Sequence, residues 1–141
     1  MAAQHAARGL PEKGFREGYT RHAKALVAAG SGTGSDQEFG LETEFVALNN
    51  PYEAGYGGLM SVKLLYKGKS RADAQVEVFE QRSGERVRVF MTRTNASGIA
   101  SIRTKPGYNY LLDAVVLRVP ERGAKNIAWE TLWAALTFKH P

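Results

Sequence analysis

Residues 94–119 read TNASGIASIRTKPGYNYLLDAVVLRV, and this stretch decides the fold class. It contains a polar turn, a short strand, a Pro-Gly corner and a long apolar strand, with no room for a helix between them. The long strand, Tyr108–Val119, has apolar residues on both of its faces. This pattern is typical of a central strand in a covered sheet, because an edge strand usually alternates between apolar and polar residues. The stretch therefore predicts an all-β protein.

Segments on both sides of this stretch also have the composition of strands. With it, the predicted strands are Leu41–Leu48, Leu59–Tyr66, Ala72–Glu80, Arg86–Thr92, Ile99–Arg103, Tyr108–Val119 and Ile127–His140. Turn-forming residues such as Asn-Pro, Lys-Gly and Ser-Gly separate them. Short strands at such regular spacing are typical of two packed sheets. We predict a seven-stranded sandwich, either immunoglobulin-like or prealbumin-like.

The segment Arg86–Thr92 alternates between apolar and polar residues. Val87, Val89 and Met91 share one face of this segment, and charged or polar residues occupy the other. Because the apolar face of a strand normally turns toward the core, the pattern predicts that these three side chains point inward.

The last segment, IAWETLWAALTFKH, fits two structures. Trp129, Leu132, Trp133 and Leu136 have the i, i+3, i+4, i+7 spacing of an amphipathic helix. The same residues also fit a strand with Leu132 and Leu136 on one face and the two tryptophans on the other. The regular series of strands before it favours a strand, which would complete the sandwich.

The N-terminal segment is predicted to be an arm outside the sandwich. Residues 15–29 have a helix-like apolar spacing, but Gly14 and Gly18 weaken a helix, and an extended conformation also fits. The sequence GSGTGSDQ that follows is typical of a linker. We therefore assign residues 1–38 to an arm and linker and residues 39–141 to the sandwich domain.

Composition limits the possible classes of protein. A chain of 141 residues is long enough for one domain with an appendage. It has no cysteine, so neither disulfides nor thiolate metal sites contribute to the fold. No apolar run approaches the roughly 18 residues of a membrane span. The first 15 residues also lack the apolar core of a secretory signal.

The chain is basic, with a formal net charge of +5 and a pI near 9.6. A nucleic-acid-binding protein usually gathers its basic residues on one face. Here Lys and Arg are spread along the sequence and interleaved with Glu and Asp, as in EQRSGERVRV. We therefore expect no nucleic-acid partner.

Two resemblances follow from these segments. The series LYKGKSRADAQVEVF, TNASGIASI and KPGYNYLLDA resembles prealbumin-like and carboxypeptidase-regulatory-like sandwiches. The segments RHAKALV, LETEFVALNNPY, VKLLYKGK, AQVEVFE, YLLDAVVLR and AWETLWAALTF are similar to the C-terminal part of an uncharacterised, exported bacterial family, formerly labelled a periplasmic component of nickel or cobalt uptake. The second resemblance implies a periplasmic or otherwise exported parent protein. It also implies a further β domain before this segment, which is missing here.

The metal implied by this resemblance, nickel or cobalt, would take imidazole and carboxylate ligands. The histidines are His5, His22 and His140, and none lies two to four residues from another. His22 and His140 are the candidate ligands, and solvated surface histidine is the alternative. Glu42 and Glu44, one residue apart, could hold a hard cation or form a solvent-exposed face.

No arrangement of residues predicts catalysis. Asp113 lies between apolar residues of the long strand, where a buried carboxylate requires a partner such as Arg103, Arg118 or Tyr108. A structural ion pair or a hydrogen-bonded strand carboxylate explains such a residue without any chemistry. Because no serine has a histidine within predictable reach, we expect a protein that is not an enzyme.

The outward face of the last two strands is the candidate binding surface. The side chains predicted to bind a partner there are Leu111, Val115, Leu117, Trp129 and Trp133. A contiguous apolar area of that size seldom stays exposed on a monomer. The arm, the missing domain or a second copy of the chain could cover it. The predicted function is therefore an interaction or ligand-presenting module, possible alternatives being a periplasmic nickel- or cobalt-binding protein and a carbohydrate-binding module.

Overall fold

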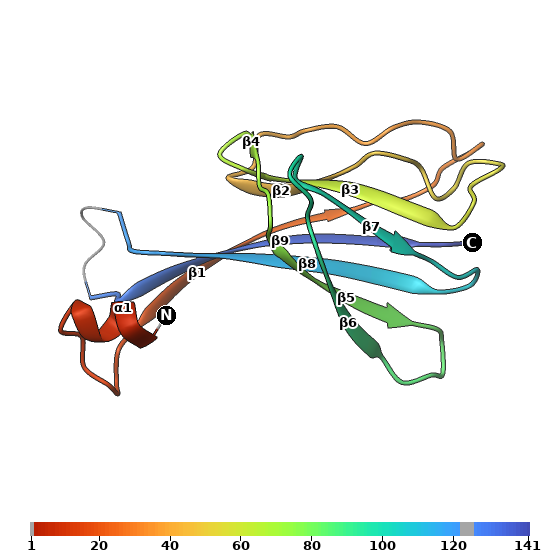
Figure 1. The fold of residues 1–141 in the computed structure, drawn as a ribbon. Helices are drawn as coiled ribbons and strands as arrows, with labels where there is room; N and C mark the ends of the chain where they lie inside the picture. Colours follow the sequence, from red (N-terminus) through yellow and green to blue (C-terminus); the bar gives the residue numbers. More distant parts are fainter. Residues whose placement is uncertain (1, 122–125) are drawn as a thin grey trace.

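The computed structural model describes residues 2–121 and 126–141 (Figure 1). This part of the chain contains one short helix and nine strands. The elements are α1 (Ala2–Ala7), β1 (Glu17–Ala25), β2 (Thr43–Ala47), β3 (Leu59–Tyr66), β4 (Lys69–Ser70), β5 (Gln75–Gln81), β6 (Arg88–Arg93), β7 (Ile99–Arg103), β8 (Asn109–Arg118) and β9 (Trp129–Lys139).

The strands form two sheets that pack face to face. One sheet has five strands in the order β1-β9-β8-β5-β6, and it is the lower layer in Figure 1. The other contains β2, β3 and β4, with β7 paired to β3. All pairs are antiparallel except β1 with β9, which run parallel. The predicted all-β sandwich is therefore confirmed.

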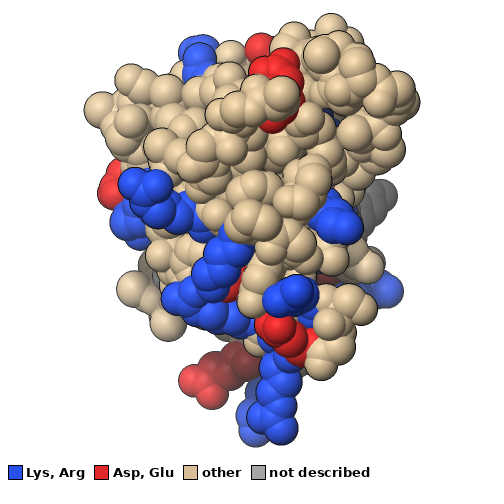
Figure 2. Space-filling model, turned by 90° about the vertical axis from the view of Figure 1, so that its right-hand side faces the viewer, with Lys and Arg blue, Asp and Glu red and all other residues tan. Residues whose placement is uncertain are grey.

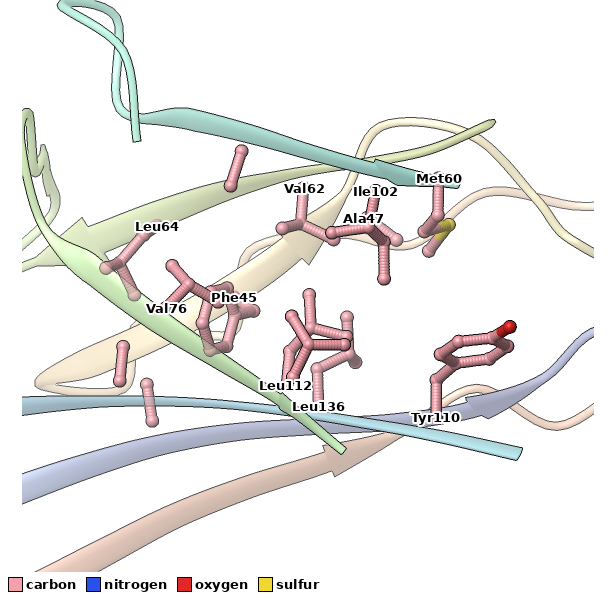
Figure 3. Packing of buried hydrophobic residues seen from close by; sticks show 14 of the residues in the cluster. Phe45, Ala47, Met60, Val62, Leu64, Val76, Ile102, Tyr110, Leu112 and Leu136 are labelled. Carbon is pink, nitrogen blue, oxygen red and sulfur yellow. The ribbon is translucent and has the colours of Figure 1, made fainter. Parts of the chain in front are cut away.

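The core fills the space between the two sheets (Figure 3). Phe45 and Val62 point down from one sheet, and Leu112 and Leu136 point up from the other. All four side chains are fully buried. The ring of Tyr110 stacks on Phe138 at a centroid distance of 5.3 Å, so the cross-strand pair of β8 and β9 contributes aromatic packing as well.

The seven predicted strands correspond to β2, β3 and β5 to β9, with end positions that differ by a few residues. The ambiguous segment at the C-terminus forms the strand β9, because Leu132, Leu136 and Phe138 all enter the core from one face. Two strands were not among the seven. They are the two-residue β4 and the N-terminal β1.

Residues 17–25 are extended rather than helical. Every residue of β1 pairs with β9, from Glu17 opposite Trp129 to Ala25 opposite Thr137. At Gly18, which lies opposite Glu130, a Cβ atom would lie 3.1 Å from the end of the Ile127 side chain, so this position is tightly packed. Of the two conformations predicted for residues 15–29, the extended one is correct over these positions. The helix α1 lies earlier in the chain.

The orientation predicted for β6 is wrong. Val87, Val89 and Met91 are 49%, 48% and 60% exposed, whereas Phe90 packs against the core. Pairing with β5 sets this orientation, because Val78 lies opposite Phe90 and both therefore face inward. The larger aromatic side chain occupies the core, and the smaller apolar side chains face outward. Alternation along a short strand cannot distinguish these two possibilities.

The Gly/Ser-rich segment is anchored to the sandwich. The ammonium group of Lys24 donates to Asp36 Oδ2 and to the carbonyl oxygens of Gln37 and Phe45, all at 2.9 Å. Asp36 also accepts a hydrogen bond from the backbone N–H of Ala47. Residues 36–37 are thereby fastened to β1 and β2. A sequence with a linker's composition thus contains a specific buried ion pair.

Candidate interaction face on the five-stranded sheet

The five-stranded sheet has one face in the core and one that turns away from the other sheet. We call the second surface the outer face. Its large apolar side chains are Tyr19, Phe79, Val89, Met91, Leu111, Val115, Leu117 and Trp133. Five of these residues are exposed, up to 60% at Met91 and 73% at Tyr19, and the other three, Phe79, Leu111 and Trp133, are half-buried.

The corresponding surface of the smaller sheet is more polar. At its centre, Ser61 and Ser101 lie opposite each other and share a hydrogen bond of 2.8 Å between their hydroxyl groups. Lys63 is the next outward residue on β3. Both sheets therefore bury one face in the core, but the larger sheet leaves an apolar centre on its other face. This difference makes the outer face the candidate interaction surface.

Neighbouring strands place the outer-face residues in rows. One row runs across all five strands and contains Met91, Glu77, Asp113, Ala135 and Ala23. The next row contains Val89, Phe79, Leu111, Thr137 and Ala25. On the other side of the acidic residues, Val115 lies opposite Trp133, which in turn lies beside Arg21. Two carboxylates therefore lie within a mostly apolar surface.

Asp113 is the most unusual of these residues. It is only 6% exposed, and its Oδ1 has no hydrogen-bond partner among the described residues. Burial raises the pKa of its carboxyl group, while the charge of Arg21 opposes that rise. Among the described residues, none of the partners predicted from the sequence bonds it, so the ion pair, one of the two structural explanations, is not formed. A backbone hydrogen bond at Ala114 also opposes the rise of its pKa.

Two of those predicted partners are occupied elsewhere. Arg118 binds Glu130 of the neighbouring strand β9 at 2.6 Å, and it also binds Glu42, which directly precedes β2 of the other sheet. The hydroxyl group of Tyr108 donates to Glu85. Arg118 is on the same strand as Asp113 and Tyr108 directly precedes that strand, yet each has another acidic partner. The sequence indicated that Asp113 is buried, because it lies within an apolar strand. It could not show that Arg118 and Tyr108 bind other acidic residues.

Trp129 is covered by the N-terminal arm. Its indole N–H donates to His5 Nδ1 at 2.9 Å, and the guanidinium group of Arg8 lies 4.8 Å above the ring. His5 Nε2 in turn lies 2.9 Å from the carbonyl oxygen of Pro11. The ring of Trp129 is only 2% exposed as a result. Figure 1 shows α1 beside the end of the sheet where β1 and β9 begin.

The other four predicted contact residues remain on the open part of the outer face. Val115 and Leu117 are each 37% exposed, and Leu111 and Trp133 are half-buried. Arg21 lies 5.3 Å above the ring of Trp133. The arm thus covers one end of the predicted surface. It leaves the remaining residues together on two adjacent strands.

A groove extends the outer face toward the end of the sheet where β9 ends. It has a volume of about 520 Å³, and Phe79, Val87, Leu111 and Val27 contribute apolar walls. Tyr52 fixes the nearby chain, since its hydroxyl group donates to the Leu26 carbonyl and accepts from the backbone N–H of Lys139. The outer face therefore has a groove as well as exposed apolar side chains.

The same end of the molecule carries many cationic side chains (Figure 2). The exposed members are Arg82, Arg86, Arg88, Arg103, Lys105 and Lys139. Buried Glu80 engages two of them, Lys105 at 2.7 Å and Arg88 at 3.4 Å, and also accepts from Tyr110 at 3.0 Å. Burial would raise the pKa of Glu80, but the bonds from Lys105 and Tyr110 outweigh it and lower that pKa.

The two candidate metal ligands lie apart. His22 pairs with Ala134 in the middle of β1, and His140 follows the end of β9, so roughly 20 Å of extended chain separates their levels. His140 Nδ1 is 3.0 Å from the hydroxyl group of Thr104. Within residues 2–121 and 126–141, no three His, Asp or Glu side chains are grouped closely enough to hold a metal ion.

Glu42 and Glu44 do not form a shared cation site. Glu44 is 1% exposed, and its carboxylate accepts the backbone N–H groups of Phe39, Gly40 and Leu41. Glu42 instead bonds Arg118, which lowers the pKa of its carboxyl group. The two acids therefore stabilise different parts of the fold. Neither the cation-site interpretation nor the solvent-exposed one describes Glu44.

Within the described residues, no helix is both long enough and apolar enough to cross a membrane. No curated protein matches the chain. A family model described as "Domain of unknown function (DUF4198)" matches residues 6–118, from α1 to the end of β8. Since this match covers well over half of the sequence, the chain belongs to that family.

Proposed function

We propose that this chain is a non-enzymatic interaction module of an exported bacterial protein, and that its outer face binds another protein. The observation that carries the proposal is the apolar part of the outer face, where Val115 lies opposite Trp133 and Leu111 and Leu117 project from the same side of β8. Large exposed apolar patches on soluble proteins usually mark binding surfaces. Aromatic residues such as Trp133 often supply much of the binding energy of an interface.

Two further features support this proposal. The centre of the smaller sheet's outward surface is polar, with the Ser61–Ser101 hydroxyl pair, so the apolar surface is not a general property of the chain. The groove of about 520 Å³ beside Leu111 also provides a place for a protruding side chain. The proposal that the parent protein is exported rests on the resemblance to exported bacterial proteins.

The proposed partner can be sought with a photo-crosslinking amino acid at position 115. The full-length protein is expressed in the organism it comes from, and the same amino acid at position 101 serves as the control on the other sheet. We expect an adduct from position 115 and not from position 101. The adducted protein must also bind the unlabelled chain when both are purified.

Equal adducts from both positions would contradict the proposal. So would an adducted protein that fails to bind when purified. An adduct between two copies of the chain would identify a homodimer as the occupant, and the proposed second protein would then be wrong. Sedimentation of the purified chain distinguishes this outcome, because it detects self-association without any partner.

The link to transition-metal uptake rests on the resemblance alone. Calorimetric titration with nickel tests it directly, with His22→Ala and His140→Ala as the relevant variants. Micromolar binding that either variant abolishes would favour a metal-binding protein. Flat heats at millimolar nickel would remove metal capture by these histidines from the possible functions.

A further inference from the structure

Glu77 and Asp113 occupy directly opposite positions on β5 and β8. Side chains in such positions have Cβ atoms about 5 Å apart, and two like charges there repel each other. Several neighbours of the pair are apolar: Met91 lies opposite Glu77, and Leu111 and Val115 flank Asp113 on its own strand. The polar neighbour on this face of β5 is Gln75, which lies opposite Arg93. An acidic pair at the centre of an apolar surface is costly for a protein that binds nothing there.

The described residues leave this pair without a bonded cation. Neither carboxylate forms an ion pair with any described residue. Arg21 lies over the ring of Trp133, and Arg93 bonds Asp73 at 2.8 Å. Asp113 Oδ1 is buried and has no hydrogen-bond partner among the described residues. A buried acceptor of this kind costs free energy until a donor reaches it.

The surroundings suit an organic cation better than a metal ion. Only two carboxylates meet here, and no group of three potential ligands occurs among the described residues. A hard cation such as Ca²⁺ takes six to eight oxygen ligands. The side chains of Leu111 and Val115, which flank Asp113, can instead contact the methylene groups of a long basic side chain.

We infer that Glu77 and Asp113 form the binding site for a basic side chain, arginine or lysine, of the protein that docks on the outer face. This inference rests on the proposed function. The guanidinium group of arginine fits best, because its planar arrangement of donors can bond both carboxylates at once. Apolar residues of the same partner segment would cover Leu111, Val115 and Trp133.

The site can be probed with small molecules by NMR. Phenethylammonium carries an aromatic ring and a cation, and 2-phenylethanol is its neutral counterpart. We expect phenethylammonium to shift the amide signals of Glu77 and of residues 111–115, with a dissociation constant at least fivefold lower than that of the alcohol. In Asp113→Asn the preference should fall to below twofold. The matched control Glu53→Gln, which removes one exposed negative charge elsewhere, should keep the full preference.

The outcomes separate this inference from the proposed function. Equal binding of both probes on the outer face, or an unchanged preference in Asp113→Asn, would overturn the basic-side-chain site and leave the docking surface intact. Shifts confined to other surfaces would contradict both. A calcium titration is the last experiment. If calcium binds more tightly than phenethylammonium and displaces it, the pair is a metal site instead.

Discussion

Glu80 and Asp113 lie on adjacent strands and are both nearly buried, yet folding shifts their pKa values in opposite directions. Glu80 faces the core side and accepts bonds from Lys105, Arg88 and Tyr110. Asp113 faces outward and has no bonded cation among the described residues. Hydrogen-bonded partners therefore decide the direction of each shift, and burial alone does not.

Replacement of Asp113 by asparagine should stabilise the protein at neutral pH. A carboxyl group whose pKa is raised by folding contributes stability below its ordinary pKa, 3.8, and that contribution is lost as pH rises through the raised value. Removing the charge also removes its repulsion with Glu77. We expect the free energy of unfolding to rise by about 1 kcal/mol at pH 7 and to change little near pH 3.

Urea denaturation of Asp113→Asn and the parent protein at both pH values measures this effect. Gln75→Asn, on the same face of β5, is a control without a change in charge. A loss of stability at pH 7 in Asp113→Asn would mean that the carboxylate has a favourable partner in the folded protein, contrary to the unpartnered Oδ1.

Replacement of Glu80 by glutamine should have the opposite effect. Its lowered pKa means that Glu80 contributes stability above the ordinary value, 4.5, and that this is lost as pH falls through the lowered pKa. Glu80→Gln weakens the charge-assisted bonds to Lys105 and Tyr110, and we expect a loss of about 2 kcal/mol at pH 7.

Thermal unfolding monitored by circular dichroism checks the Glu80 prediction, and exposed Glu53→Gln should change stability by less than about 0.5 kcal/mol. If both variants unfold at the same temperature, Glu80 does not stabilise the fold through its bonds. Stability is compared at pH 7 and at a pH below both the ordinary and the lowered pKa of Glu80. This comparison separates the effect of removing the charge from the effect of changing the shape of the side chain.

At the level of elements, the sequence allowed most strands to be predicted. Alternating residues and turn signals located seven of them, because burial on one face produces the alternation and the chain reversals between strands select the turn residues. The pattern failed for β6, where both faces contain apolar residues and only the pairing with β5 decides that Phe90 enters the core. It left β1 undecided, because a parallel pairing with the distant β9 leaves no local signal.

The anchored segment between β1 and β2 depends on Lys24. Its side chain is 8% exposed, and Asp36 and Glu44 lie within 4 Å of its ammonium group. Lys24→Met would leave two buried carboxylates without this cation, which costs about 3 kcal/mol or more. Hydrogen exchange should show faster exchange at the amides of residues 36–47, while exposed Lys13→Met should leave them unchanged. Unchanged exchange in Lys24→Met would show that the ion pair does not hold the segment.

The arm should protect Trp129 through His5. His5→Ala removes the acceptor of the indole N–H, so we expect the Trp129 emission to shift to the red as water reaches the ring. The measurement requires a Trp133→Phe background, in which Trp129 is the remaining tryptophan. Lys13→Ala in the same background is the control. An emission spectrum identical to that of the parent would contradict the docking of α1 on this ring.

At the level of the whole molecule, the two outward surfaces differ in polarity. The sequence indicated the candidate site through the apolar residues of β8 and β9, and four of the five predicted residues lie on the open part of the outer face. It did not indicate Phe79, Val89 and Met91, because strand order determines that β5 and β6 extend the same surface. Nor could it show that the arm covers Trp129.

The most direct test of the outer face uses the partner protein that crosslinking identifies. Once purified, its affinity for two single variants of the chain is measured. Val115→Asp places a charge in the apolar centre, and Ser101→Asp places the same charge on the smaller sheet. By calorimetry, we predict that Val115→Asp weakens binding at least tenfold, a cost of about 1.4 kcal/mol, while Ser101→Asp changes it less than twofold. Circular dichroism must show both variants folded. Equal affinity of the two variants would contradict the assignment of the outer face as the binding surface.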